Sequence, residues 1–149
     1  MKSIINLFLG AVIGTAFVYD MYFGIIPNKV IIIGYFVLFP YTYLSESWNG
    51  VYRSVVAVVL SGTILLMIFL VHGISAGDVK LLSMLVGYFK INDGLKFLVL
   101  VFYIGAFVGI IKIIMNVAVN LKIEKGMTKI KFSAPILAGY MLMLISKGG

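Results

Sequence analysis

A succession of long apolar runs, divided by short polar intervals, dominates the chain. The clearest run extends from Val51 to Val71 and reaches the roughly 20 residues that a helix needs to cross a bilayer. Hydrophobic residues make up 62% of the sequence and charged residues only 11%, far from the balance of a soluble domain. We therefore expect residues 1–149 to form a single, all-α, multi-pass integral membrane domain.

The apolar runs predict a bundle of about six transmembrane helices. They cover roughly residues 4–19, 30–44, 51–71, 79–89, 95–121 and 132–145. An even number of crossings puts both termini on one side and the loops at Asp20, Asp78 and Lys122–Lys131 together on the other. The last of these loops holds the densest cluster of lysines, so the positive-inside rule predicts that all three face the cytoplasm. Asp20 and Asp78 then lie at the same face of the membrane.

Asp20 and Asp78 are the strongest candidates for function. The chain has only five acidic residues, and these two lie at the ends of apolar segments, where a retained carboxylate is a functional candidate by default. Two carboxyl groups held near one another cannot both ionise cheaply, so such a pair shares one proton. The ionised member can take a proton from water while the protonated member polarises a peptide carbonyl, which permits hydrolysis without a metal. The plainer alternative is that each aspartate only ends a helix, with Asp78 as an N-terminal cap.

The residues around the two aspartates suit a substrate site. Gly77 lets a substrate backbone approach Asp78 without an intervening side chain. Pro27 favours the start of a second helix, and Asn28 can cap that helix or bond to loop backbone groups. Lys80 lies two positions after Asp78, so on a helix the two side chains point to different faces. We expect Lys80 to reach the membrane interface, with a substrate or lipid contact as the alternative.

Composition excludes several classes of function. The chain has no cysteine, which excludes disulfides, thiolate metal sites and a cysteine nucleophile. One histidine and few acidic residues give too few ligands for a zinc or two-metal centre, and we expect no cofactor. The net charge of +7 would suit nucleic acid in a soluble protein, but here the basic residues fall mostly in loops and meet anionic lipid head groups. We therefore expect the lipid bilayer as a partner, and no nucleic acid.

Two local motifs surround the aspartates. In the first, Asp20 is followed by five residues and then Ile26-Pro27-Asn28; the second reads Ser75-Ala76-Gly77-Asp78-Val79-Lys80. Together they resemble the type IV prepilin peptidases, integral membrane aspartic proteases of bacteria, to which archaeal preflagellin peptidases are related. That family has an aspartate, five residues and Ile-Pro-Asn, and later Gly-x-Gly-Asp-x-Lys. The departure is Ser75 in place of the first glycine, a small residue that preserves close packing.

The resemblance implies an activity, a substrate and a set of site residues. The substrate would be a precursor of a type IV pilin, a pseudopilin or a Tad-type pilin, with a short basic leader that ends in glycine and precedes a hydrophobic helix. Larger members carry a further cytoplasmic domain with paired cysteines, linked to methylation of the new N-terminus. Because the chain has no cysteine and no room for that domain, we expect the peptidase-only form, which cleaves without methyl transfer. The implied catalytic pair is Asp20 and Asp78, on the cytoplasmic side, and the supporting motif residues are Ile26, Pro27, Asn28, Gly77 and Lys80.

Two other functions stand as alternatives. The segment Gly73-Ile74-Ser75-Ala76-Gly77 matches the G-x-S-x-G pattern of serine hydrolases, with His72 beside it. We expect no strand-rich sheet to build the nucleophile elbow, and His72 suits an interfacial polar residue better than the base of a serine. A transporter or channel subunit would use membrane carboxylates to relay protons or bind a cation, but both aspartates lie near segment ends rather than at mid-membrane. The particular substrate, the oligomeric state, the choice of base and the assembly of the pair before substrate binding stay open at this point.

Overall fold

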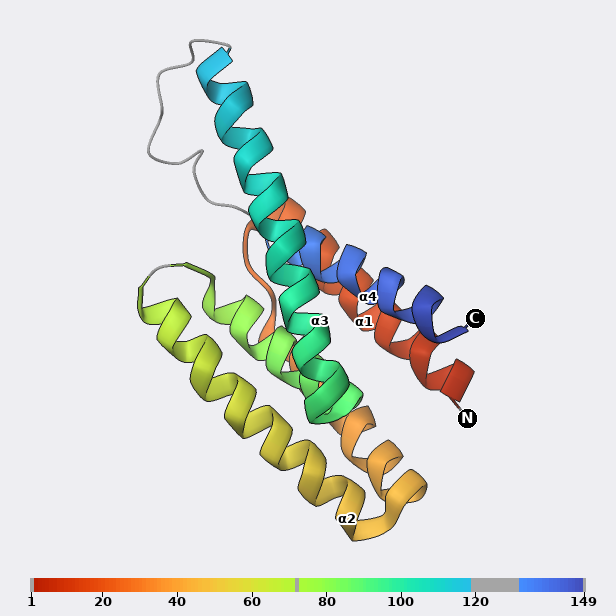
Figure 1. The fold of residues 1–149 in the computed structure, drawn as a ribbon. Helices are drawn as coiled ribbons and strands as arrows, with labels where there is room; N and C mark the ends of the chain where they lie inside the picture. Colours follow the sequence, from red (N-terminus) through yellow and green to blue (C-terminus); the bar gives the residue numbers. More distant parts are fainter. Residues whose placement is uncertain (1, 72, 119–131, 149) are drawn as a thin grey trace.

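The computed structural model describes residues 2–71, 73–118 and 132–148. They form four α-helices: α1 (Lys2–Phe23), α2 (Asn28–Leu70), α3 (Ala76–Ala118) and α4 (Ser133–Gly148) (Figure 1). The described part of the chain contains no strand, so the all-α prediction is confirmed. The lysine-rich loop at 122–131 and His72 lie outside the described residues.

The predicted count of six separate helices is wrong, because the described residues form four. The expected second and third segments run together as α2, and the fourth and fifth run together as α3. The helix in each case continues past a single residue with non-helical backbone angles, Ser47 in α2 and Lys90 in α3. Each polar interval that we expected to be a loop is therefore a single sharp kink between two helical arms of the same element.

Both long helices fold back on themselves at these bends (Figure 1). The two bends lie next to one another, since the Lys90 ammonium forms an ion pair with the Glu46 carboxylate. Arg53 adds a longer contact to the same carboxylate at 4.0 Å. Charged groups that sit at a bend of an otherwise apolar bundle suit the membrane–water boundary.

Three helices have the length and composition of membrane spans. The matching segments are Ile4–Phe23, Asn28–Leu70 and Ala76–Met115, and α4 is a shorter apolar helix. Large apolar side chains such as Leu7, Phe36 and Val99 point outward. Such a surface would be unfavourable in water but is compatible with lipid, which supports the predicted membrane protein.

The first arm of α3 forms the centre of the bundle. Every residue from 81 to 87 is buried, and small residues let α2 pack closely around this arm. A Cβ atom at Gly34 would lie 2.1 Å from the Met84 sulfur, and the Ser54 hydroxyl donates a hydrogen bond to the Gly87 carbonyl oxygen at 3.0 Å. In lipid the hydrophobic effect does not drive helices together, so close van der Waals packing between small residues stabilises their association instead. This packing places the start of α3, with Asp78, inside the bundle.

Helices α1 and α4 pack side by side in opposite directions (Figure 1). Near the start of α1, the Tyr140 hydroxyl donates to the Asn6 carbonyl oxygen at 2.7 Å, and the Tyr88 hydroxyl donates to Asn6 Oδ1. These bonds join α1, α3 and α4 at one end of the bundle. Asp20 lies 14 residues further along α1, about 21 Å away at the helical rise, and so belongs to the other end.

Candidate active site

Asp20 lies in the last turn of α1. The helix ends at Phe23, because Gly24 adopts a left-handed φ of 67° and its N–H donates to the Asp20 carbonyl oxygen at 3.0 Å. The Asp20 side chain points into the bundle and is only 8% exposed. Its Oδ2 accepts a hydrogen bond from the hydroxyl of Ser133, the first residue of α4. The sequence motifs gave no signal for Ser133, which lies 113 residues away.

Asp78 lies in the first turn of α3 and is 3% exposed. Its N–H donates to Ser75 Oγ at 3.2 Å, and the Ser75 N–H donates to Asp78 Oδ2 at 3.2 Å. These reciprocal bonds form a capping box at the helix start. Oδ1 of Asp78 is buried and accepts no hydrogen bond from the residues that the structure describes. The capping interpretation therefore accounts for one oxygen of Asp78 and leaves the other without a structural role.

The structure brings the two aspartates together from different helices. Asp20 lies near the end of α1 and Asp78 near the start of α3, and the loop after α1 packs through Ile26 against Gly77, the residue before Asp78. This agrees with the prediction that both lie at one end of the bundle. Two like charges in a buried, low-dielectric site repel strongly, so the arrangement favours one shared proton over two ionised carboxylates. A pair that holds one proton can offer both a base and an acid.

The flanking motifs contact one another and so fix the position of Asp20 relative to Asp78. Ile26 is buried, and a Cβ atom added at Gly77 would lie 3.0 Å from Ile26 Cβ. The glycine is therefore needed for close packing of the loop after α1 against the start of α3. Nearby, the Lys80 ammonium donates to Asn28 Oδ1 at 3.0 Å. The two motifs thus dock through one apolar and one polar contact.

The structure revises two expectations about these flanking residues. Asn28 does not cap α2: the cap position is Pro27, which has an extended backbone with ψ 133° and no side-chain cap bond, and the Asn28 side chain binds Lys80 instead. The Lys80 ammonium is exposed, as expected, but its observed partner is this amide oxygen. Ser75 acts in the capping box, and the described residues supply no sheet for a serine elbow.

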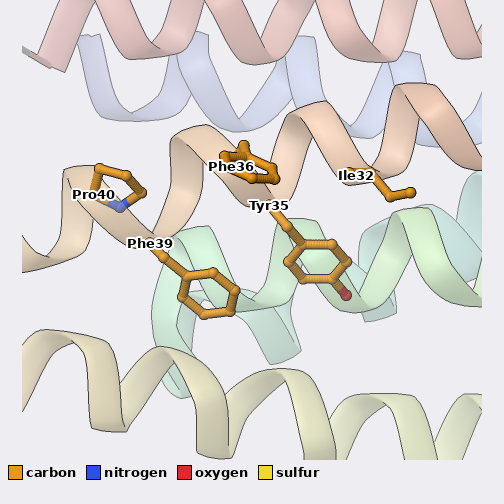
Figure 2. A pocket seen from close by; sticks show the side chains of 5 residues that line it. All are labelled: Ile32, Tyr35, Phe36, Phe39 and Pro40. Atoms are coloured by element: carbon orange, nitrogen blue, oxygen red, sulfur yellow. The ribbon is translucent and has the colours of Figure 1, made fainter.

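An apolar groove lies outside this site, on the outer face of α2. It has a volume of about 410 Å³, and Figure 2 shows Tyr35 and Phe39 pointing from α2 toward its own second arm. The lining residues all come from the first arm of α2: Ile32, Tyr35, Phe36, Phe39 and Pro40. No cluster of three His, Asp or Glu side chains able to hold a metal ion occurs in the described ranges.

Comparison with known proteins identifies a relationship over most of the chain. A family model described as the type IV leader peptidase family matches residues 7–110. The match includes both aspartates and both flanking motifs, and α4 lies beyond it. No curated protein and no solved structure matches the chain significantly.

Proposed function

Because the chain belongs to the type IV leader peptidase family, we propose that it is a membrane-embedded aspartic endopeptidase that removes the leader from type IV pilin-like precursors. The single observation that carries the proposal is that two buried carboxylates, Asp20 from α1 and Asp78 from α3, meet at the end of the bundle where Ile26 packs against Gly77. The capping box does not explain this meeting, since it uses only one oxygen of Asp78. A carboxylate pair can supply both the general base and the general acid that peptide hydrolysis without a metal requires.

The proposed reaction is a direct attack of water on the scissile carbonyl. The ionised carboxylate takes a proton from water while the new C–O bond forms, and the protonated carboxyl group gives its proton to the carbonyl oxygen. When the tetrahedral intermediate collapses, the C–N bond breaks and the first carboxyl group protonates the leaving amine nitrogen. The second carboxylate recovers its proton from the hydroxyl group as the new carboxylic acid forms. The pair ends with one proton, as it began.

The proposed substrate has a short basic leader that ends in glycine and precedes a hydrophobic helix. The apolar helix would lie in the bilayer beside α1–α4, and the leader would reach the aspartates at the end of the bundle. We propose that this end faces the cytoplasm and that the reaction is hydrolysis alone, without transfer of a methyl group. Gly77 serves this site in another way than the sequence suggested, because Ile26 of the protein itself fills the space beside it and packs the loop after α1 against the start of α3.

Co-expression with a pilin-like precursor in membranes tests the proposal. The mass of the precursor is measured with the parent chain and with Asp20→Asn, Asp78→Asn and Ser75→Ala. We expect the parent and Ser75→Ala to remove the leader, and both asparagine variants to leave it intact. Asp93→Asn is the matched control, since it removes another α3 carboxylate, one that pairs with Lys96 at 3.9 Å, and should still cleave.

Two outcomes would contradict the proposal. If Ser75→Ala abolished cleavage while an asparagine variant still cut, a serine mechanism would replace the aspartic one. If the parent cut none of several precursors although it accumulated in the membrane, the peptidase assignment would fail, and proton or cation transport would become the better explanation for the buried carboxylates.

A further inference from the structure

Helix α4 reaches the candidate active site although it lies beyond the residues that the family model matches. The family match ends at residue 110, and α4 begins at Ser133. Ser133 is 1% exposed, and its hydroxyl donates to Asp20 Oδ2. The fold thus aims a buried hydroxyl from α4 at one of the two carboxylates.

The bond has a chemical consequence for Asp20. A hydrogen bond to a charged acceptor is about twice as strong as one between neutral groups, and low dielectric strengthens it further. A donor on Oδ2 fixes the rotation of the Asp20 carboxylate, so that Oδ1 is left to act on another group. In water the same hydroxyl would contribute little, because solvent would compete for both partners.

The two carboxylates are held differently. Asp20 receives a side-chain hydroxyl from a separate helix, whereas Asp78 receives a backbone N–H from its own capping box. The remaining oxygen of Asp78 is buried without a hydrogen-bond donor from the described residues. An unsolvated oxygen of this kind is a poor place for negative charge and a suitable place for the shared proton.

We propose that Ser133 is a positioning residue that fixes the orientation of the Asp20 carboxylate, so that Asp20 activates water while Asp78 carries the shared proton. This inference rests on the proposed peptidase function. It makes α4 part of the active site, because the last helix supplies the group that distinguishes the two aspartates.

Steady-state kinetics of the purified full chain in lipid nanodiscs test this role, with a pilin-like precursor peptide as the substrate. We expect Ser133→Ala to lower kcat by about tenfold to a hundredfold, with KM within about twofold of the parent. Ser133→Thr keeps the hydroxyl and should recover most of the lost kcat. Ser61→Ala is the matched control: it removes another buried hydroxyl, which bonds only within its own helix, and should leave kcat unchanged.

Melting temperatures, measured in parallel, separate a positioning role from a structural one. The inference is overturned if Ser133→Ala cleaves at the parent rate, or if Ser133→Ala and Ser61→Ala lose kcat equally. If Ser133→Ala does not accumulate, Ser133→Cys takes its place, since a thiol keeps the volume but is a weak donor; parent-like kcat would then overturn the inference. Failure of the proposed function is distinguishable, because it would appear as cleavage by Asp20→Asn.

Discussion

At the scale of single residues, two serines and one glycine determine the position and orientation of the aspartate side chains. Each aspartate has Oδ2 bound by a serine, Asp20 by Ser133 and Asp78 by the backbone of Ser75. Gly77 adds the close packing that brings the second motif against Ile26. Among the described residues, size and hydrogen bonding therefore hold the carboxylates in place, and no ion pair to either aspartate occurs there.

Replacing Gly77 with alanine tests this packing. The new Cβ atom would lie 3.0 Å from Ile26 Cβ, which is attached directly to the backbone and cannot rotate away. We expect Gly77→Ala to lower the free energy of unfolding by about 1–3 kcal/mol and to reduce cleavage, because the two motifs must separate. Thermal unfolding in detergent and the cleavage assay measure both effects.

Gly14→Ala is the control for this prediction. No atom lies within 4 Å of a Cβ atom placed at Gly14 in α1, so the substitution should not reduce stability and should leave cleavage intact. A Gly77→Ala protein as stable and active as the parent would contradict the described docking of the motifs.

At the scale of helices, the architecture depends on two sharp bends. Ser47 has φ 56° and ψ −153°, and Lys90 has φ 66° and ψ 171°. This region of backbone space is strained for any residue other than glycine, at a cost of about 1–3 kcal/mol each. The ion pair between Lys90 and Glu46 holds the two bends together and offsets part of that strain.

Relief of this strain predicts a stabilising substitution. Ser47→Gly should raise the melting temperature, corresponding to a gain of about 1 kcal/mol, because glycine adopts the observed backbone angles without a Cβ clash. Ser45→Gly is the matched control: Ser45 is helical, and the same substitution there should destabilise by about 0.5 kcal/mol. A melting temperature of Ser47→Gly below that of the parent would contradict the positive φ angle described at this bend.

At the scale of the whole molecule, polar contacts at opposite ends of the bundle join α1 to α4, and one of them also joins α1 to α3. One end has the tyrosine bonds to Asn6, and the other has the aspartate site.

Tyr140→Phe removes a hydroxyl that donates across helices and should cost about 1 kcal/mol of stability while cleavage continues. Tyr103→Phe, at a side chain that is 75% exposed, should change neither property, and equal melting temperatures for the two variants would contradict the proposed role of Tyr140.

Sequence patterns identified the class of fold and the two aspartate motifs. Apolar runs predicted membrane helices, and the cost of a carboxylate near lipid singled out Asp20 and Asp78. The predicted helix count failed because hydropathy shows only where the polar intervals lie. It does not show whether the chain turns there through a loop or at one strained residue, such as Ser47. The same-end placement of the aspartates survived this error, since a helix that folds back on itself returns the chain to the side where a loop would have put it.

The contact of Ser133 with Asp20 was not predictable from the sequence. A serine at the start of an apolar helix is ordinary helix-end chemistry, and only tertiary packing aims its hydroxyl at a residue on α1. The partner of Asn28 was missed for the same reason, because its contact with Lys80 joins positions 52 residues apart.

The most direct test of the account is whether the two motifs dock as described in the membrane without substrate. The chain has no cysteine, so Ile26→Cys with Gly77→Cys introduces the only two thiols. A disulfide has a Cβ separation of about 3.8 Å, so the small opening that a Cβ at Gly77 forces from the present 3.0 Å brings the two thiols to bonding distance. We therefore expect mild oxidation to link most of the protein, as read by the mass of the joined peptides. The control pair, Gly14→Cys with Gly77→Cys, should stay reduced, because no atom lies within 4 Å of a Cβ at Gly14. Efficient linkage of the first pair alone would support the preassembled carboxylate site; failure of that pair to link, with both thiols open to labelling, would contradict it.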